Sequence, residues 1–484
     1  MKKIPGYLLT LLLAAGCGGS SSHNDGGDDG GSVRLVAIAV TPASVELEVG
    51  AAVQLEAVGT YSDDSTGDVT GQVEWIVDPA SVASVAAGQV NALEAGEATV
   101  HAYLDYVSSN PVTVAVNDPE HYEARGVWVT RWNYSSANDI QQIVDNLAAG
   151  GFNQMYFQVR GTADAYYQSS VEPWAAGLSG VLGRDPGWDP LQTAVDLGHR
   201  AGLQVHAWLN TFPCWNCGAA LPQSEGIPHV LESHPEWAAA DQNGISMIDG
   251  CTDGYISLSP GVPGVREHIR LVCEDIFRNY DVDGIHLDYI RYPGIQYSHD
   301  AVSEAAFADA QVQDPDLTWE DWQRRQVNLT VEGVFNTLMT ERPDAALSAA
   351  VWFIRQNVWG WSAVSEGYHQ YYQDPWAWTR GGYIDAVAPM IYFPLSDPPG
   401  QRLDFRAMLQ DHLSGNPDRY VYAGIHGDYS SFSEIENEIA AGRELGARGL
   451  VIFAYVYIVD HGFWDDFAQG PLSEEAVPPL LVWR

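Results

Sequence analysis

The sequence predicts an α/β protein built on a (β/α)8 barrel, with a small β-sandwich preceding it. After about residue 123, apolar strands alternate with amphipathic helices, which is typical of a parallel sheet covered by helices. Before that point, short stretches of alternating polarity are separated by Gly, Asp, Ser and Pro. A chain of 484 residues, 46% of them hydrophobic, is also too long for one ordinary domain. We therefore expect at least two domains.

The barrel prediction depends on eight strands and eight helices that alternate within residues 119–470. The predicted strands are 126–130, 152–160, 203–210, 282–292, 345–352, 383–392, 419–426 and 449–455. The predicted helices are 137–150, 189–201, 263–280, 319–341, 371–381, 404–414, 431–446 and 461–468. Eight such pairs close a barrel of the usual size. A long insertion, 211–260, separates the third strand from its helix, and residues 471–484 form a C-terminal tail.

The β-sandwich is predicted over residues 33–118, where five or more short stretches alternate in polarity. This region resembles the bacterial immunoglobulin-like group 2 modules. The matching features are Pro42, Gly50, QLEA at 54–57, Trp75 and GEATVHA at 96–102. The resemblance implies a spacer or an adhesive unit. We favour a spacer that holds the barrel away from a membrane.

Residues 1–17 have the features of a secretory signal. Lys2 and Lys3 precede an apolar run that is too short to span a bilayer as a mature helix. Small residues stand directly before Cys17, so the segment resembles a bacterial lipoprotein signal, in which this cysteine is lipidated. That resemblance implies an exported protein anchored by lipid to the cell envelope, at the outer membrane. Ordinary cleavage that discards Cys17 is the alternative.

Residues 18–32 contain Gly, Ser and Asp but no apolar side chain to bury, so they predict a flexible tether. A calcium site in this Asp-rich stretch is the alternative.

The charge of the chain excludes several classes of function. Asp and Glu number 63 against 23 Lys and Arg, which gives a formal net charge of −40. Such a surface repels nucleic acid and anionic lipid, so we expect neither as a partner. The lysines are Lys2 and Lys3 alone, within the predicted signal, so Schiff-base chemistry is excluded after processing. Solubility or a salty habitat is a sufficient reason for the acidity.

Polar side chains follow the carboxyl ends of the predicted strands, where parallel barrels place their ligand sites. In DGIHLDYIRYP at 283–293, the even-numbered residues face inward and Asp288 ends the strand. His206 is expected to lie deeper, where a core role is the alternative. The same parity recurs in other strands, and the residues expected at one mouth are Trp128, Gln158, Arg160, His206, Trp208, Asn210, His286, Asp288, Trp352 and His426.

Carboxylates at this mouth suggest glycosidic cleavage, which needs an acid for the leaving oxygen and a second carboxylate as nucleophile or base. Asp288 has the firmest placement and is predicted to be the nucleophile or base, with Arg291 keeping it ionised. A structural ion pair of Asp288 with Arg291 or Arg160 is the alternative.

The second carboxylate stays open between Asp164 and Asp374. Asp164 follows the second strand and Asp374 begins a helix, so each has a competing role in a turn or a helix cap. Glu172 and Glu366 lie in adjacent loops.

Aromatic and hydrogen-bonding side chains near the strand ends fit sugar recognition, because sugar rings stack on flat faces. A polysaccharide is therefore the expected partner. The predicted substrate-binding residues are Arg160, Trp128, His206, Asn210, Arg291, Trp352 and Tyr392.

Four cysteines lie beyond Cys17, in a protein that is expected to be exported and oxidised. Cys251 lies in the same insertion as Cys214 and Cys217 and is expected to bridge to one of them. Cys273 shares an apolar helix face, which predicts a buried free thiol. Zinc is the alternative, but it lacks clear further ligands. We expect neither a metal nor a cofactor.

The barrel region resembles the glycosyl hydrolase-like family 10 lipoproteins. Shared motifs are RGVWVT at 125–130, QVRGTADAYY at 158–167, EPW at 172–174, GWDPL at 187–191, HAWLN at 206–210, LSPGVPGVR at 258–266, DGIHLDYIRYP, YYQD at 371–374 and IDAVAPMIY at 384–392. In this sequence Ser259 stands where the family more often has Asp or Asn, which removes a possible polar contact. The CWNC stretch at 214–217 is not part of the family pattern.

The resemblance implies a glycoside hydrolase that acts on cell-wall glycan, most directly the glycan strands of peptidoglycan, with Asp288, Asp164 and Asp374 at motif positions. Two alternatives are a glycan-binding barrel without catalysis and an adhesive lipoprotein.

Overall fold

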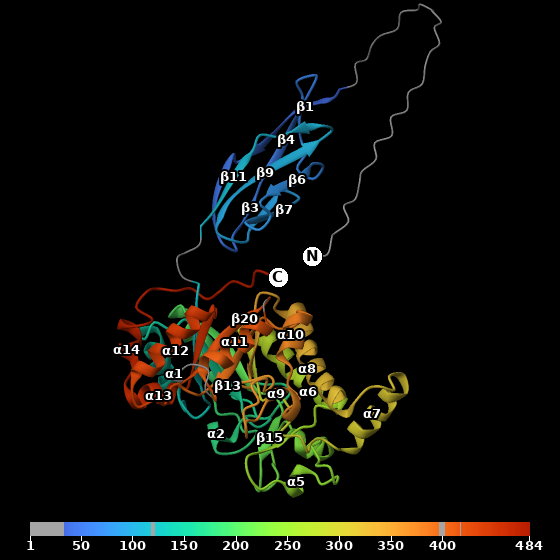
Figure 1. Ribbon diagram of the computed structural model, residues 1–484, viewed down its shortest axis with the longest axis vertical. Coiled ribbons are helices and arrows are strands. Elements are labelled where there is room, and N and C mark those ends of the chain that lie inside the picture. The colour runs from blue at the N-terminus through green and yellow to red at the C-terminus, as the bar shows by residue number, and fades with distance from the viewer. Residues whose placement is uncertain (1–32, 118–121, 396–401, 417) are drawn as a thin grey trace, which may run out of the picture. The chain divides into compact units, whose positions relative to one another are not determined.

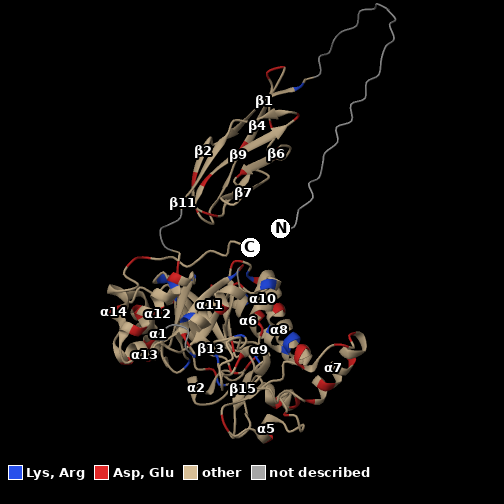
Figure 2. Ribbon diagram, viewed as in Figure 1, with Lys and Arg blue, Asp and Glu red and all other residues tan. Residues whose placement is uncertain are grey.

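The structure is a computed structural model that describes residues 33–117, 122–395, 402–416 and 418–484 (Figure 1). The predicted signal, Cys17 and the tether 18–32 lie outside the described residues. The chain divides into two compact units, one ending at Asn117 and the other beginning at Asp118. Among the described helices, none is long and apolar enough to cross a membrane. Acidic residues are spread along the ribbons of both units (Figure 2).

The first unit is a β-sandwich, as the alternating pattern predicts. Its strands are β1 (Leu35–Thr41), β2 (Ser44–Glu48), β3 (Ala52–Gln54), β4 (Glu56–Tyr61), β5 (Thr66–Asp68), β6 (Glu74–Asp78), β7 (Ala83–Ala86), β8 (Gln89–Ala92), β9 (Gly96–Leu104), β10 (Val107–Ser108) and β11 (Val112–Asn117). The largest sheet has the order β10-β9-β11-β2, with β6 also paired to β9. Buried residues such as Leu55, Val90, Val100 and Val114 form the core, because alternate residues of each strand face inward.

The second unit is a closed parallel barrel whose eight strands match the eight predicted ones. They are β12 (Ala124–Val129), β13 (Gln154–Arg160), β14 (Gln204–Asn210), β17 (Gly284–Asp288), β18 (Ala346–Val351), β19 (Ala386–Ile391), β20 (Tyr420–His426) and β21 (Gly449–Phe453). Neighbours follow chain order, and β21 pairs with β12 to close the barrel. The register sets Asn210 beside Asp288, so their strand ends meet at one mouth.

Helices cover the barrel where the sequence predicts them, and further helices lie between them. The matching helices are α1 (Ala137–Ala149), α3 (Pro190–Arg200), α6 (Pro263–Asn279), α8 (Trp319–Glu341), α10 (Pro375–Gly381), α11 (Phe405–Gly415), α12 (Phe432–Leu445) and α14 (Trp464–Gln469). The helix predicted from 371 begins at Pro375, because proline suits the first helical turn, and a short α9 (Gly367–Gln370) precedes it. The helices that were not expected include α7 (Ala301–Gln313), which buries Ser303 alone, and α13 (Tyr455–His461). The short helices α2 (Ala176–Ser179), α4 (Val230–Ser233) and α5 (Met247–Gly250) were not expected either.

The strand that carries Asp288 ends earlier than the sequence predicts. β17 stops at Asp288, whereas the apolar pattern continues to residue 292. Tyr289 has a φ of 50°, in the left-handed region, so the extended backbone cannot continue. The turn returns Arg291 toward the strand end, with its Nη1 3.6 Å from Asp288 Oδ1. A local backbone conformation therefore builds part of the site.

Ser259 keeps a polar contact, contrary to the expectation from its family position. Its hydroxyl donates to Asp300 Oδ2 at 2.7 Å, and the hydroxyls of Ser298 and Ser303 donate to the same oxygen at 2.8 and 2.7 Å. Asp300 also caps α7 by accepting the Ser303 N–H at 2.9 Å. The short serine side chain reaches a polar partner because Asp300, in the segment before α7, lies beside it.

The C-terminal tail lies against the end of the barrel at which the strands begin. Asp385, directly before β19, is fully buried and accepts hydrogen bonds from Leu347 N at 2.7 Å and Trp483 Nε1 at 2.8 Å. Arg484 forms an ion pair with the same carboxylate. The tail therefore supplies both an indole donor and a charge to a buried acid.

We predict that Arg484→Ala lowers the free energy of unfolding by about 1–3 kcal/mol, because a buried carboxylate loses a charged donor. Urea denaturation measures this difference. Arg406→Ala is the control, since Arg406 pairs with Glu444 on the surface, where both side chains are well exposed. Equal losses in the two variants would contradict the role assigned to Arg484.

Candidate active site

A cavity of about 220 Å³ opens at the carboxyl ends of the barrel strands. Trp128 and Asn210 reach it from the ends of β12 and β14, Asp288 from the end of β17, and Tyr392 from the residue after β19. Arg291 enters from the turn after β17. The structure thus brings together five of the residues that the sequence analysis assigned to the site. They converge because parallel strands present their last inward residues to the same mouth.

Asp288 is buried at the wall of this cavity, with 6% of its surface exposed. Burial raises the pKa of its carboxyl above the usual range, although Arg291 and the Tyr289 N–H favour the ionised form. The Tyr289 N–H donates to Oδ1 at 2.6 Å, while Arg291 stays at 3.6 Å, beyond hydrogen-bond distance. Arg291 thus favours the ionised form of Asp288, as expected, while burial shifts the pKa in the opposite direction and has the larger effect.

Asn210 is held by neighbouring strand ends. Its Oδ1 accepts from Gln158 Nε2 at 3.1 Å, and its Nδ2 donates to the Gly161 carbonyl at 3.1 Å. Gln158 Oε1 in turn accepts from the Arg131 backbone N–H at 3.1 Å and from its Nη1 at 3.2 Å. Arg131 continues the chain to the Tyr255 hydroxyl at 3.3 Å. These bonds fix the orientation of the amides and leave few rotamers to freeze when a ligand binds.

Aromatic faces form much of the remaining wall. Trp128 is buried and donates from Nε1 to His286 Nε2 at 3.0 Å, so its indole plane is fixed. The Tyr392 ring stacks on Phe453 with centroids 5.1 Å apart. Trp132 is 69% exposed at the rim, with the Arg131 guanidinium 4.0 Å from its ring centroid. Flat faces of this kind suit a sugar ring.

Arg160 is placed away from this cavity, contrary to its predicted substrate contact. It is fully buried and forms a two-point ion pair with Glu172, Nε to Oε2 and Nη2 to Oε1, both at 2.8 Å. Its Nη1 donates to the carbonyls of Asn210 and Thr211. The guanidinium is satisfied by the protein, so Arg160 positions the strand ends rather than a ligand. Strand parity gave its inward direction correctly but could not show that Glu172 folds back to it.

His206 lies at the opposite end of the barrel interior, so its predicted substrate contact is also a correction. It lines a cavity of about 270 Å³ with Gln154, Gln204 and Arg484, and its ring stacks on Tyr156 at 5.0 Å. Burial lowers its pKa to about 4, which keeps the imidazole neutral. His206 therefore has the core role that was the alternative. It lies near the start of β14 and so away from the mouth of the barrel.

The two candidates for the second carboxylate are both engaged elsewhere. Asp164 Oδ1 accepts from Thr162 N at 2.8 Å and from its hydroxyl at 3.2 Å, which is a turn contact. Asp374 pairs with Arg355 Nε at 2.7 Å and makes no side-chain cap to α10. Glu366 accepts from the Asn357 N–H. Neither Asp164 nor Asp374 is among the described residues that line the cavity of Asp288.

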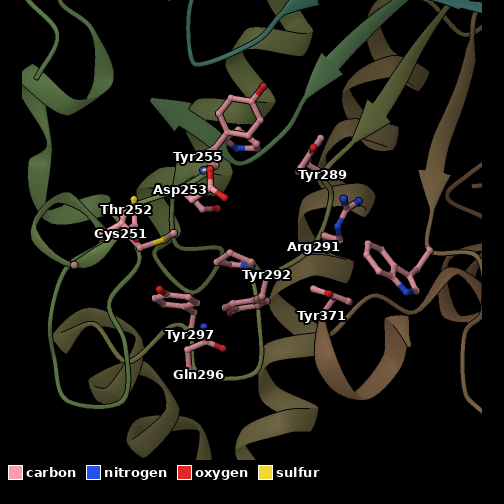
Figure 3. A pocket seen from close by; sticks show the side chains of 17 residues that line it. Cys251, Thr252, Asp253, Tyr255, Tyr289, Arg291, Tyr292, Gln296, Tyr297 and Tyr371 are labelled. Atoms are coloured by element: carbon pink, nitrogen blue, oxygen red, sulfur yellow. Dashed lines mark hydrogen bonds between the residues drawn. The ribbon is translucent and has the colours of Figure 1, made fainter. Parts of the chain in front are cut away.

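A larger cavity of about 690 Å³ adjoins the first and is shown in Figure 3. Tyr255, Tyr289 and Arg291 line both cavities, so the two spaces share a wall. Trp352 lines the larger cavity rather than the one that contains Asp288, which corrects its expected position. Asp253, beside Tyr255 in Figure 3, also lines it. The site is therefore an elongated space rather than a single hole.

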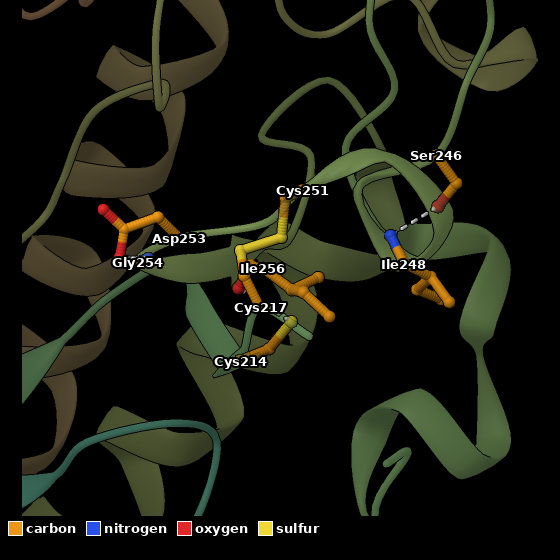
Figure 4. The surroundings of a disulfide bond; sticks show 8 residues. All are labelled: Cys214, Cys217, Ser246, Ile248, Cys251, Asp253, Gly254 and Ile256. Carbon is orange, nitrogen blue, oxygen red and sulfur yellow. Dashed lines mark hydrogen bonds between the residues drawn. A yellow bond between two sulfur atoms is a disulfide. The ribbon is translucent and has the colours of Figure 1, made fainter. Parts of the chain in front are cut away.

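A disulfide joins Cys217 and Cys251 (Figure 4), as expected from their shared insertion. The insertion forms a hairpin of β15 (Pro213–Asn216) and β16 (Tyr255–Ser257), with α5 (Met247–Gly250) ahead of the second cysteine. Cys214 and Cys273 are buried free thiols, the latter as predicted. Among the described residues, no group of three or more His, Cys, Asp or Glu is placed to hold a metal.

Three residues that line these cavities were not predicted from the sequence: Arg131, Tyr255 and Asp253. Arg131 directly follows a predicted strand, and this position was a usable signal. Tyr255 and Asp253 lie in the insertion, where no periodicity relates residue number to position in space.

Comparisons with known proteins agree with this architecture. The family model described as "Glycosyl hydrolase-like 10" matches residues 123–427, and the one described as "Bacterial Ig-like domain (group 2)" matches residues 36–114. The resemblance of the barrel to the glycosyl hydrolase-like family and that of the β-sandwich to the immunoglobulin-like modules are confirmed.

Two relatives and one solved structure illustrate the similarity. Glycosyl hydrolase YngK of Bacillus subtilis (strain 168) is 27% identical over 414 residues, which cover 77% of this chain and 76% of the relative. Glycosyl hydrolase DigH of Escherichia coli (strain K12) is 27% identical over 273 residues, which cover 52% of this chain and 57% of DigH. The glycoside hydrolase domain of PgaB (BpsB) from Bordetella bronchiseptica has a TM-score of 0.53 and 16% identity, over 74% of this chain and 100% of that one, and supports the fold alone.

The family model covers more than half of the chain, and its motifs surround the cavity of Asp288. The predicted class of glycoside hydrolase is thus confirmed at the level of the family. The chain belongs to the glycosyl hydrolase-like 10 family.

Proposed function

We propose that this protein cleaves glycosidic bonds in the glycan strands of peptidoglycan, with Asp288 as the general acid. The observation that carries the proposal is the buried Asp288 carboxyl, with its raised pKa, in an aromatic cavity at the barrel mouth. A carboxylic acid that keeps its proton can pass it to the leaving oxygen as the bond breaks. This role replaces the nucleophile or base expected from the sequence, because burial shifts the pKa of the carboxyl upward, which is the direction that suits a general acid.

The second carboxylate in this proposal is Asp253. It lines the larger cavity, which shares Tyr255, Tyr289 and Arg291 with the cavity of Asp288. Figure 3 places Asp253 and Arg291 on different walls of this space. Asp253 is exposed, so it stays accessible to water and serves as the base for the attacking molecule. Asp253→Asn should therefore lower kcat on every cleaved glycan.

The choice of peptidoglycan is supported by the motifs that this chain shares with lipoproteins acting on cell-wall glycan. A relative that covers half of the chain is named a glycosyl hydrolase from Escherichia coli. We place the enzyme at the cell envelope, because the proposed anchor is a lipid on Cys17. The tether 18–32 and the immunoglobulin-like module would then hold the barrel away from the membrane.

The test offers the purified protein three substrates: intact peptidoglycan, peptidoglycan strands stripped of their peptides, and a β-glucan without acetamido groups. New reducing ends and soluble fragments are measured. We expect reducing ends from the stripped strands and none from the β-glucan. Binding to the strands without cleavage would instead identify a non-catalytic glycan-binding protein, and neither binding nor cleavage would favour an adhesive one. Both outcomes contradict the proposal.

A further inference from the structure

We propose that the 690 Å³ cavity is a subsite for further sugar rings of the same glycan strand, which rests on the function proposed above. The two cavities differ in size. The cavity of Asp288 measures about 220 Å³, whereas ligand pockets usually measure about 300–1,000 Å³. The larger cavity, at about 690 Å³, falls in that range. A glycan held in the smaller space alone would leave most of the site empty.

The two cavities are continuous along a shared wall. Tyr255, Tyr289 and Arg291 belong to the walls of both cavities, so a chain of linked rings can pass from one to the other. The rings of Tyr255 and Tyr289 meet edge to face, with centroids 5.9 Å apart. A linear polymer that presents one bond to Asp288 therefore has to extend across this shared wall.

The larger cavity is lined by aromatic rings and by a hydrogen-bond donor. Trp352 and Tyr371 form an aromatic pair with centroids 4.3 Å apart on one wall, and Tyr297 lines another part of the cavity. Arg291 Nη1 is buried and has no hydrogen-bond partner among the described residues, although it forms an ion pair with Asp288 Oδ1 at 3.6 Å and its guanidinium lies over the Tyr289 and Trp352 rings. A sugar hydroxyl or an acetamido carbonyl would satisfy this donor, while the aromatic faces receive the ring.

A disulfide holds one wall of the larger cavity in place. Cys251 lines the cavity and is bonded to Cys217, directly after β15. The disulfide therefore ties the segment that carries Asp253 to the hairpin of the insertion (Figure 4). A wall fixed before binding costs less ordering when the glycan arrives.

The experiment measures binding by calorimetry to the full-length Asp288→Asn protein, so that no ligand is cleaved. The probes are oligosaccharides of two, four and six rings from the strand that the wild type cleaves. We expect affinity to rise at least tenfold from two rings to six. Tyr371→Ala in the same background should remove most of this rise and leave the affinity for two rings unchanged. Trp132→Ala, at the rim of the smaller cavity, is the matched control and should weaken all three lengths equally.

A second variant, Cys217→Ser with Cys251→Ser, should also reduce the rise, and its melting temperature shows that the barrel is folded. Affinity that does not change with length, or equal weakening of all lengths by Tyr371→Ala, would overturn the subsite. Cleavage by the wild type with no dependence on length would overturn the subsite while the proposed function stands. If the wild type cleaves no glycan and the Asp288→Asn protein binds none, both proposals fall.

Discussion

Replacing Asp288 by asparagine is expected to lower kcat on the cleaved glycan by about 10²- to 10⁴-fold, because an amide cannot donate the proton that the leaving oxygen needs. Initial rates of reducing-end release measure the loss. Glycan affinity should change little, since Asn has nearly the same shape as Asp. The control is Asp281→Asn, because Asp281 is exposed and pairs with Arg342 on the surface. Rates that match the wild type would rule out Asp288 as the acid.

The same substitution should raise stability at neutral pH. The folded state raises the pKa of Asp288, so folding favours the protonated acid, and its contribution is lost as the pH rises through the folded pKa. Asparagine removes that cost. We expect a higher melting temperature for Asp288→Asn at neutral pH and a smaller difference in acid. This trade between stability and activity is common where a site holds a buried acid.

Glu172→Gln is expected to lower the free energy of unfolding by about 3–5 kcal/mol, because it leaves the Arg160 charge buried without its partner. Arg160 and Glu172 are 0% and 1% exposed, and His268 Nε2 adds a contact to Glu172 Oε1 at 2.8 Å. Denaturant unfolding provides the measurement. Glu225→Gln is the matched control, since the Arg184–Glu225 pair is more than half exposed and should contribute at most about 1 kcal/mol. Similar losses in the two variants would contradict the account.

The effect of Glu172 should also depend on pH. Burial raises its pKa, but the charge of Arg160 and the contact with His268 outweigh burial and lower the pKa to about 2. A lowered carboxyl pKa stabilises the fold above the unfolded value of 4.5 and loses this contribution as the pH falls toward the folded value. The difference between the wild type and Glu172→Gln should therefore shrink between about pH 4.5 and pH 2. A difference that stays constant over this window would show that the charge of Glu172 is not its source.

The fold was largely predictable because its signals are local. Apolar strands that alternate with amphipathic helices specify the eight barrel strands one after another. Capping residues fix helix starts such as Asp189, which accepts the Gln192 N–H at 3.0 Å. The missed helix α7 has no apolar face to detect. The early end of β17 depends on the left-handed conformation of Tyr289, which nothing in its apolar neighbours indicates.

The site was only partly predictable, because parity gives the face of a strand and not the partners that arrive from loops. It placed Asp288, Asn210 and Trp128 correctly at the mouth. It could not show that Arg160 is neutralised by Glu172. Nor could strand parity show that Asp253 lines the larger cavity, in a segment that the disulfide of Cys251 holds.

We infer that the glycan is cleaved beside Asp288 at the barrel mouth. A crystal structure of the Asp288→Asn protein with a six-ring oligosaccharide of the cleaved glycan tests it most directly. We expect a glycosidic oxygen about 3 Å from the side chain of residue 288. Further sugar rings should continue along the wall that Tyr289 and Arg291 form between the two cavities. An oligosaccharide bound elsewhere on the barrel, with this cavity empty, would contradict it.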